Sequence, residues 1–152
     1  MMQNIHTLVQ QLRQPGARVS VGVWFFPMMY LGREEDISVS LNVEPLDARQ
    51  AYLEHLPEGA KHSGLRTRHA HEKLFEFIHS VGNTTYTRNC VLVHTFDLLL
   101  LGMEVDAREH FWNSALALPY LRTKLVIALP ENARYLLSNS SRFISQIAEG
   151  LL

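Results

Sequence analysis

Two apolar runs limit what this chain can fold into more than any other feature. CVLVHTF covers residues 90–96 and TKLVIALP covers residues 123–130, and both are rich in aliphatic side chains with almost no polar alternation. Strands of this kind are covered on both faces, as in the centre of a parallel sheet with helices on either side. The chain therefore predicts an α/β fold around a central, largely parallel or mixed sheet of four or more strands flanked by helices.

The rest of the chain supplies further elements for such a fold. A buried strand is predicted over 19–27, where VSVGVWFFP is β-branched and aromatic, and a second over 37–43, where ISVSLNV alternates. About ten residues separate these two strands, so they either pair as an antiparallel hairpin or join through one helical turn. From apolar spacing and cap residues, helices are predicted over 4–14, 47–57, 68–80, 106–118, 131–137 and 144–152.

Composition bounds the class of protein. The 152 residues, of which 47% are hydrophobic and 19% charged, predict one folded domain over 1–152. A net charge of −1 lacks the basic excess that is typical of a nucleic-acid binder. The first residues lack the features of a signal peptide, and no apolar stretch reaches the ~18 residues that a spanning helix needs. We therefore expect a cytoplasmic protein with neither membrane nor nucleic acid as its partner.

Polar residues follow both apolar runs. His94, Thr95 and Asp97 end the first run, and Glu131 and Asn132 end the second. Ligands of parallel α/β sheets bind at the carboxyl edge, where a carboxylate can hold Mg²⁺ or position water. Two interpretations stay open. These residues form a catalytic or nucleotide-facing site, or Asp97 caps a turn and His94 is a hydrogen-bonded core histidine.

Sequence motifs that identify an enzyme class are missing. The segment after the first strand, PMMYLGR, has one glycine and no lysine, so it lacks the glycine-rich phosphate cradle of nucleotide-binding proteins. His69 and His71 are two positions apart on a predicted helix, where their rings point to different faces. The single cysteine, Cys90, opens an apolar run and is predicted to be a core residue. We expect no metal site and no cofactor, with ATP and Mg²⁺ as the alternative.

Large apolar side chains are more numerous than one core requires at two places. Five of them flank the proline that ends the first strand, and two more lie off the apolar stripe of the helix over 106–118. They either cover the sheet inside the molecule or form a patch that binds a partner. The interface candidates are Phe26, Met28, Met29, Tyr30, Trp112 and Tyr120.

From residue 37 onward, the order of ISVSLNV, two helices, VLVHTFDLLLL, a helix and TKLVIALP resembles a known family. It is similar to the small P-loop-related accessory proteins of BREX-type phage-exclusion systems and, more broadly, to a reduced AAA-like ATPase core. In that resemblance, His94 takes the place of the first Walker B acid, Asp97 lies near a later acidic position, and Asn132 follows the sensor strand. Because the phosphate-binding loop and its lysine are missing, the resemblance implies a P-loop-like fold without ATP hydrolysis.

Three functions follow from these observations. The first is a non-catalytic interaction or regulatory subunit, a scaffold that docks onto other proteins of a bacterial phage-defence complex. The second is a divergent Mg²⁺-dependent nucleotide hydrolase or nuclease that uses Asp97, with His94 and Glu131, at the sheet edge. The third is a self-associating regulator, a homo-oligomer for which Trp112 would anchor the interface.

Overall fold

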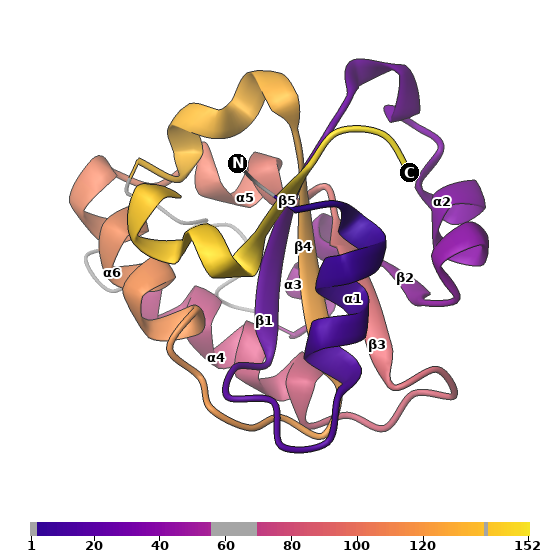
Figure 1. The fold of residues 1–152 in the computed structure, drawn as a ribbon. Coiled ribbons are helices and arrows are strands. Elements are labelled where there is room, and N and C mark those ends of the chain that lie inside the picture. Colours follow the sequence, from indigo (N-terminus) through magenta and orange to yellow (C-terminus); the bar gives the residue numbers. More distant parts are fainter. Residues whose placement is uncertain (1–2, 56–69, 139) are drawn as a thin grey trace.

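The computed structural model of the chain is an α/β fold in which five parallel strands form one sheet between two layers of helices (Figure 1). The structure describes residues 3–55, 70–138 and 140–152. In chain order the elements are α1 Ile5–Arg13, β1 Val21–Phe26, the 3-10 helix η1 Met28–Tyr30, α2 Glu34–Leu41, β2 Glu44–Asp47, α3 Ala48–His55, α4 Ala70–Gly82, β3 Cys90–His94, α5 Phe96–Leu100, α6 Val105–Ala115, β4 Lys124–Pro130, the 3-10 helices η3 Glu131–Leu136 and η4 Ser140–Gln146, and β5 Ile147–Glu149.

The sheet has the strand order β2-β3-β4-β1-β5, and every pair is parallel. Phe26 lies opposite Pro130 of β4, and Phe25 lies opposite Glu149 of β5. The predicted α/β class and the buried strands 19–27, 90–96 and 123–130 are confirmed, each trimmed at its ends. The alternative of an antiparallel hairpin is wrong, because β1 lies between β4 and β5 and does not touch β2.

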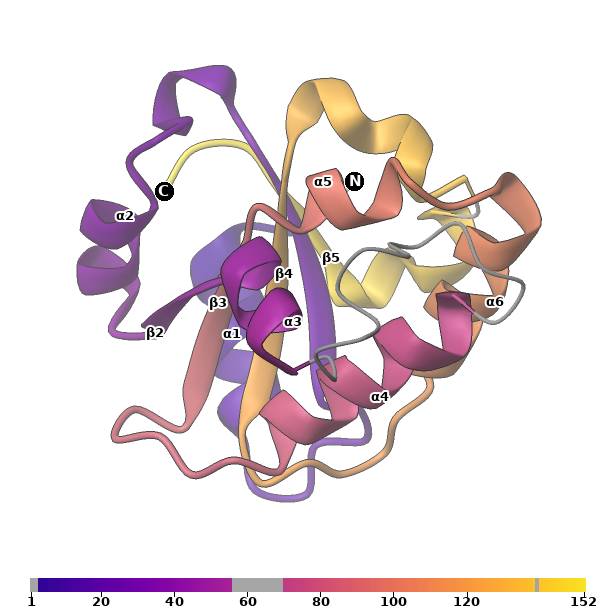
Figure 2. The same cartoon turned by 180° about the vertical axis from the view of Figure 1, so that it is seen from behind.

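Alternate residues of β1 point into two separate cores. Val23 and Phe25 pack with α4, α5 and α6 on one face, and Trp24 and Phe26 pack with α1 and α2 on the other. Figures 1 and 2 show these two layers from opposite sides. The crossover from β1 to β2 runs along the sheet in the opposite direction from the later crossovers. Because such crossovers are right-handed, α2 covers one face of the sheet, and the elements that follow it, α3 through η4, cover the other face.

The strand predicted over 37–43 is wrong, since these residues belong to α2 and the turn that follows it. Ile37 and Leu41 fit the alternation of a strand, but they also lie four residues apart, which puts both on one face of a helix. The carboxylates that precede them fill the first helical turn, where the helix dipole favours negative charge. Asn42 ends the helix in the left-handed conformation, and β2 follows it.

The helix predicted over 144–152 is also wrong. The end of η4 lies there, followed by the short strand β5 and a tail without regular secondary structure. Ile147 and Ala148 are buried because they join the sheet beside β1, where Ile147 lies opposite Val23. The spacing of these apolar residues fits a helix equally well, so only tertiary pairing decides the conformation.

Smaller corrections concern α5 and α6. Residues 96–100 form the single helical turn α5, so the strand predicted over 90–96 ends at His94. The cap of α6 is Glu104, so Asp106 lies inside its first turn, where its charge still favours the helix. The helix predicted from 68 to 80 is confirmed from Ala70 onward, whereas 68 and 69 lie outside the described residues.

Candidate functional site

The carboxyl edge of the sheet is the first place to look for a site. The chain leaves β1 toward β2 and leaves the neighbouring strand β4 toward β5, in opposite directions along the sheet. Parallel α/β sheets bind their ligands in the crevice beyond the carboxyl ends of two neighbouring strands whose connections leave in opposite directions. Here β1 turns into η1 after Pro27, and β4 turns into η3 after Pro130, with an extended backbone at each proline. Large residues, Met28 and Met29, therefore follow β1 and Pro27, where a glycine-rich turn would be needed for a ligand to approach the backbone.

The start of α2 is unsuited to a phosphate group. A helix that follows the first strand binds phosphate through free N–H groups and a positive helix end. In this chain Gly32, with φ +81°, donates its N–H to Oε1 of Glu34 over 3.1 Å. Glu34, Glu35 and Asp36 then place three carboxylates in the first turn. This negative charge repels an anion, which agrees with the missing phosphate cradle.

Thr95 and Asp47 join the ends of β3 and β2. The Thr95 hydroxyl donates to Oδ1 of Asp47 over 2.7 Å and has the His94 carbonyl, at 2.6 Å, as an alternative acceptor. The N–H groups of Arg49 and Gln50, in the first turn of α3, donate to Thr95 Oγ1 and Asp47 Oδ1 at 3.3 and 3.2 Å. The two side chains therefore cap α3 together, at the start of the helix predicted over 47–57.

This arrangement changes the acidity of Asp47. Burial by itself would raise the pKa of its carboxyl group. The hydrogen bonds from Thr95 and the α3 backbone, together with the nearby His94, lower the pKa by more than burial raises it. The net result is a pKa below the ordinary value, so Asp47 stays ionised and acts as a hydrogen-bond acceptor. Thr95 holds φ +58°, which is unusual for a β-branched residue and marks a sharp turn from β3 into α5.

The remaining candidates of the polar tip lie on three different elements, β3, α5 and η3. His94 is half-buried, and its Nδ1 has no hydrogen-bond partner in the described part of the chain, so the hydrogen-bonded histidine expected there is not found. Asp97 lies in the first turn of α5, and burial raises the pKa of its carboxyl group. The negative charge of Glu34 also raises this pKa, whereas two backbone hydrogen bonds lower it. Glu131 and Asn132 are exposed on η3.

Metal binding finds no support in this geometry. Over residues 3–55, 70–138 and 140–152, no group of three or more His, Cys, Asp or Glu side chains is placed to hold a metal ion. His71 stacks on His110 with ring centroids 5.2 Å apart, but no third ligand joins them there. His69, the other half of the predicted histidine pair, lies outside the described residues.

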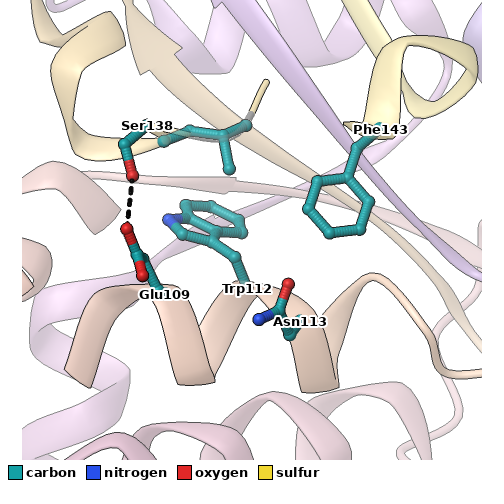
Figure 3. Close-up of a pocket in the computed structure, with 6 residues that line it drawn as sticks. Glu109, Trp112, Asn113, Ser138 and Phe143 are labelled. Carbon is teal, nitrogen blue, oxygen red and sulfur yellow. Dashed lines mark hydrogen bonds between the residues drawn. The ribbon is translucent and has the colours of Figure 1, made fainter. Parts of the chain in front are cut away.

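A shallow hollow with no room for a water molecule lies between α6 and the segment after η3 (Figure 3). Ligand pockets usually enclose about 300–1,000 Å³, so this space is a packing gap. Trp112 lies at its centre in the view and donates its ring N–H to the Leu136 carbonyl over 2.8 Å. Beside it, Ser138 donates to Oε1 of Glu109 over 3.3 Å.

The structure divides the interface candidates into two groups. Phe26 and Trp112 are buried, with exposed fractions of 3% and 2%, because both pack into the cores on either side of the sheet. They are corrected from interface candidates to core residues. Met29 is 64% exposed and Tyr120 is 74% exposed, whereas Met28 is 39% exposed and Tyr30 is half-buried. Tyr120 lies at the opposite end of the sheet, just before β4.

More exposed apolar side chains lie at the carboxyl edge than the sequence suggested. They follow four of the five strands: η1 and its loop after β1, α5 after β3, η3 after β4, and the tail after β5. Figures 1 and 2 place η1, α5 and η3 at the same end of the sheet. We call this set the apolar rim: Met28, Met29, Leu31, Leu98, Leu101, Tyr135, Leu151 and Leu152.

Most of the apolar rim escaped the sequence patterns. Leu98 and Leu101 belong to a run of four leucines that looks entirely buried, whereas α5 buries only Leu99 and Leu100. In one helical turn, residues three positions apart lie on the same side, so Leu98 and Leu101 face one way and Leu99 and Leu100 face the other. In the tail, Leu151 and Leu152 are exposed because the chain after β5 is not the helix predicted over 144–152.

Comparison of the chain with protein-family models, curated proteins and solved structures finds no match. None of the helices in the described residues is long and apolar enough to cross a membrane.

Proposed function

We propose that this protein is a non-catalytic interaction subunit that binds a protein partner through the apolar rim. One observation carries the proposal: exposed methionine and leucine side chains occupy the edge of the sheet where parallel α/β proteins bind small ligands. Eight of the thirteen exposed large apolar side chains in the described residues belong to the rim. Single exposed apolar residues are common, whereas a concentration of them at one place is typical of a binding surface.

Contacts between the segments support the rim as one surface. The Leu152 N–H donates to the Tyr30 hydroxyl over 3.3 Å, which joins the tail to η1. Asp97 of α5 lies close enough to Glu34 of α2 for its pKa to be raised by that charge. Arg134 of η3 donates to Oε2 of Glu149 over 2.6 Å, at the end of β5.

The Asp47–Thr95 cap supports the same proposal. The sharp turn at Thr95 and the carboxylate of Asp47 have a structural explanation, because they satisfy N–H groups at the start of α3. A catalytic reading would need further groups around this pair, and of the polar candidates in the described residues only His94 lies near it. The hydrogen bonds of Asp47 and Thr95 are therefore accounted for by folding, and the exposed apolar side chains are not.

The identity of the complex is part of the proposal. The family resemblance implies a cytoplasmic bacterial phage-defence assembly in which this chain docks onto larger proteins. The genes that flank this one would then encode those proteins, which makes co-expression the direct test.

The experiment is co-purification of the tagged chain with the products of its neighbouring genes. Wild type is expected to retain a partner. The double variant Met29→Ser/Leu98→Ser removes two exposed rim side chains and is expected to lose it. Tyr120→Ser is the control, because it removes a large exposed side chain at the opposite end of the sheet. Recovery of wild type without a partner, or equal retention by all three proteins, would overturn the proposal.

A further inference from the structure

We infer that the segment bound by the apolar rim is a basic amphipathic helix. This inference rests on the proposed function and adds the chemistry of the partner. It follows from the distribution of charge along the strand direction, from the side chains of the rim and from the condition of the two sheet edges.

The carboxyl edge of the sheet is acidic. From the end of each strand through the first turn that follows it, residues 27–36, 47–50, 95–99, 131–134 and 149–152 carry seven Asp and Glu against three Arg. Three of these carboxylates begin α2, directly after the exposed methionines. The apolar rim therefore lies among negative charges, and a partner with positive charges beside its apolar face would be attracted to it.

The opposite end of the sheet carries the reverse charge. The segments that lead into β1, β2, β3 and β4, residues 13–21, 42–44, 83–90 and 116–124, contain five Arg and Lys against one Glu. The net charge of −1 over the whole chain conceals this separation. A basic partner would be repelled from the amino end. The charge pattern therefore favours both a positively charged partner and its binding at the carboxyl edge.

The edge strands offer little backbone to a partner strand. β2 has four residues and includes Pro45, which cannot donate to a neighbouring strand. β5 has three residues, and Gln3 already forms an isolated parallel bridge to Ala148 there. Binding by strand addition is therefore disfavoured, and side-chain contacts at the carboxyl edge remain.

The side chains of the rim suit a helix. Met28 and Met29 are unbranched and polarisable, and methionine-rich surfaces adapt to the apolar face of amphipathic helices. Leu98 and Leu101 add branched aliphatic contacts three residues apart on α5. A helix with leucines on one side and lysines along its flanks would match both the apolar rim and the carboxylates around it.

The test uses two synthetic 18-residue peptides with the same leucine positions, one with lysine and one with glutamate at the polar positions. Fluorescence anisotropy measures binding of each labelled peptide at 0.1 M NaCl. We expect the Leu–Lys peptide to bind with Kd of about 10–100 μM and the Leu–Glu peptide at least about tenfold more weakly. Raising the salt to 0.5 M should weaken the first complex, because screening shortens the range of the attraction.

Matched variants locate the contact. Glu35→Lys/Asp36→Lys should lower the affinity for the Leu–Lys peptide by about tenfold, and Glu35→Gln/Asp36→Asn serves if the first pair unfolds α2. Arg18→Glu/Arg122→Glu changes the net charge equally at the amino end and should leave binding unchanged or slightly stronger. Circular dichroism confirms that each variant is folded.

Two outcomes would overturn the inference: equal binding of both peptides to wild type, or loss of binding in the Arg18/Arg122 pair but not in the Glu35/Asp36 pair. If co-purification with native partners still depends on Met29 and Leu98 in that case, the proposed function stands and only the chemistry of the partner is wrong.

Discussion

The hydroxyl of Thr95 and the carboxylate of Asp47, 48 residues apart in the chain, lie 2.7 Å from each other at the ends of two neighbouring strands. This hydrogen bond ties the turn after β3 to the first turn of α3. Two polar residues at the ends of buried strands thus have a role in folding that can be measured.

Thr95→Val removes the hydroxyl and keeps the shape of the side chain. We expect the free energy of unfolding to fall by about 1–2 kcal/mol, because a hydrogen bond to a charged group is lost. Urea denaturation measures the change. Asp47→Ala should cost a similar amount, and the double variant should cost less than the sum, with a coupling of about 0.5–1 kcal/mol. Strict additivity would show that the two side chains do not interact.

Asp97→Asn should make the protein more stable at neutral pH. Burial raises the pKa of Asp97 in the folded state, so its contribution to stability is present below the ordinary value near 3.8 and is lost as the pH rises through the folded-state pKa. Removing the charge at pH 7 should raise Tm by about 1–3 °C. At pH 3.5 the carboxyl is mostly protonated, and the two proteins should unfold at nearly the same temperature.

The same variant separates the interaction subunit from the hydrolase or nuclease. We expect Mg²⁺-dependent turnover of nucleotides or nucleic acid to be no different between wild type and Asp97→Asn. Turnover by wild type that disappears in the folded variant would favour the enzyme and assign Asp97 to its active site.

Trp112→Phe tests the reassignment of this residue from the surface to the core. The variant loses the hydrogen bond to the Leu136 carbonyl and part of a buried ring, so we expect a loss of about 2–3 kcal/mol in the free energy of unfolding. Tyr135→Phe is the control on an exposed ring and should change stability by less than about 0.5 kcal/mol. Unchanged stability with lost partner binding would return Trp112 to the interface.

Cys90 should resist modification in the folded protein. Burial raises the pKa of its thiol to about 11, although Arg13 and Lys124 oppose the shift. At pH 8 only about one thiol in a thousand would be ionised, and the sulfur is enclosed by the core. Ellman's reagent should therefore react with the thiol in urea and not in buffer. Rapid reaction of the native protein would show that this part of the core opens easily.

The sequence predicted those elements whose patterns admit one conformation. Residues 90–94 and 124–130 are too apolar for anything but a covered strand, and α1 has apolar residues only at helical spacing. Residues 37–43 fit both a strand and a helix, and the acidic residues before them were the signal that favoured the helix. β5 has only three residues, so its conformation depends on β1 and not on its own pattern.

The candidate site was harder to predict because it depends on neighbours in space. The position of His94 and Asp97 at the carboxyl edge follows from the end of one strand. The role of Thr95 follows only once β2 lies beside β3, and residues 44–46 of β2 fall between the strand predicted over 37–43 and the helix predicted over 47–57. The apolar rim gathers residues from four separate segments, and no single stretch of sequence contains its pattern.

The place of β5 beside β1 also bears on how the protein is made. Gln3 bridges to Ala148, and the Glu149 N–H donates to the Gln3 carbonyl, so residues near both ends of the described chain meet along one edge of the sheet. During synthesis, β1 leaves the ribosome before β5, and this edge of β1 stays open until residues 147–149 have emerged. Until then the growing chain carries an unpaired strand edge rich in aromatic residues, which a chaperone would protect from aggregation.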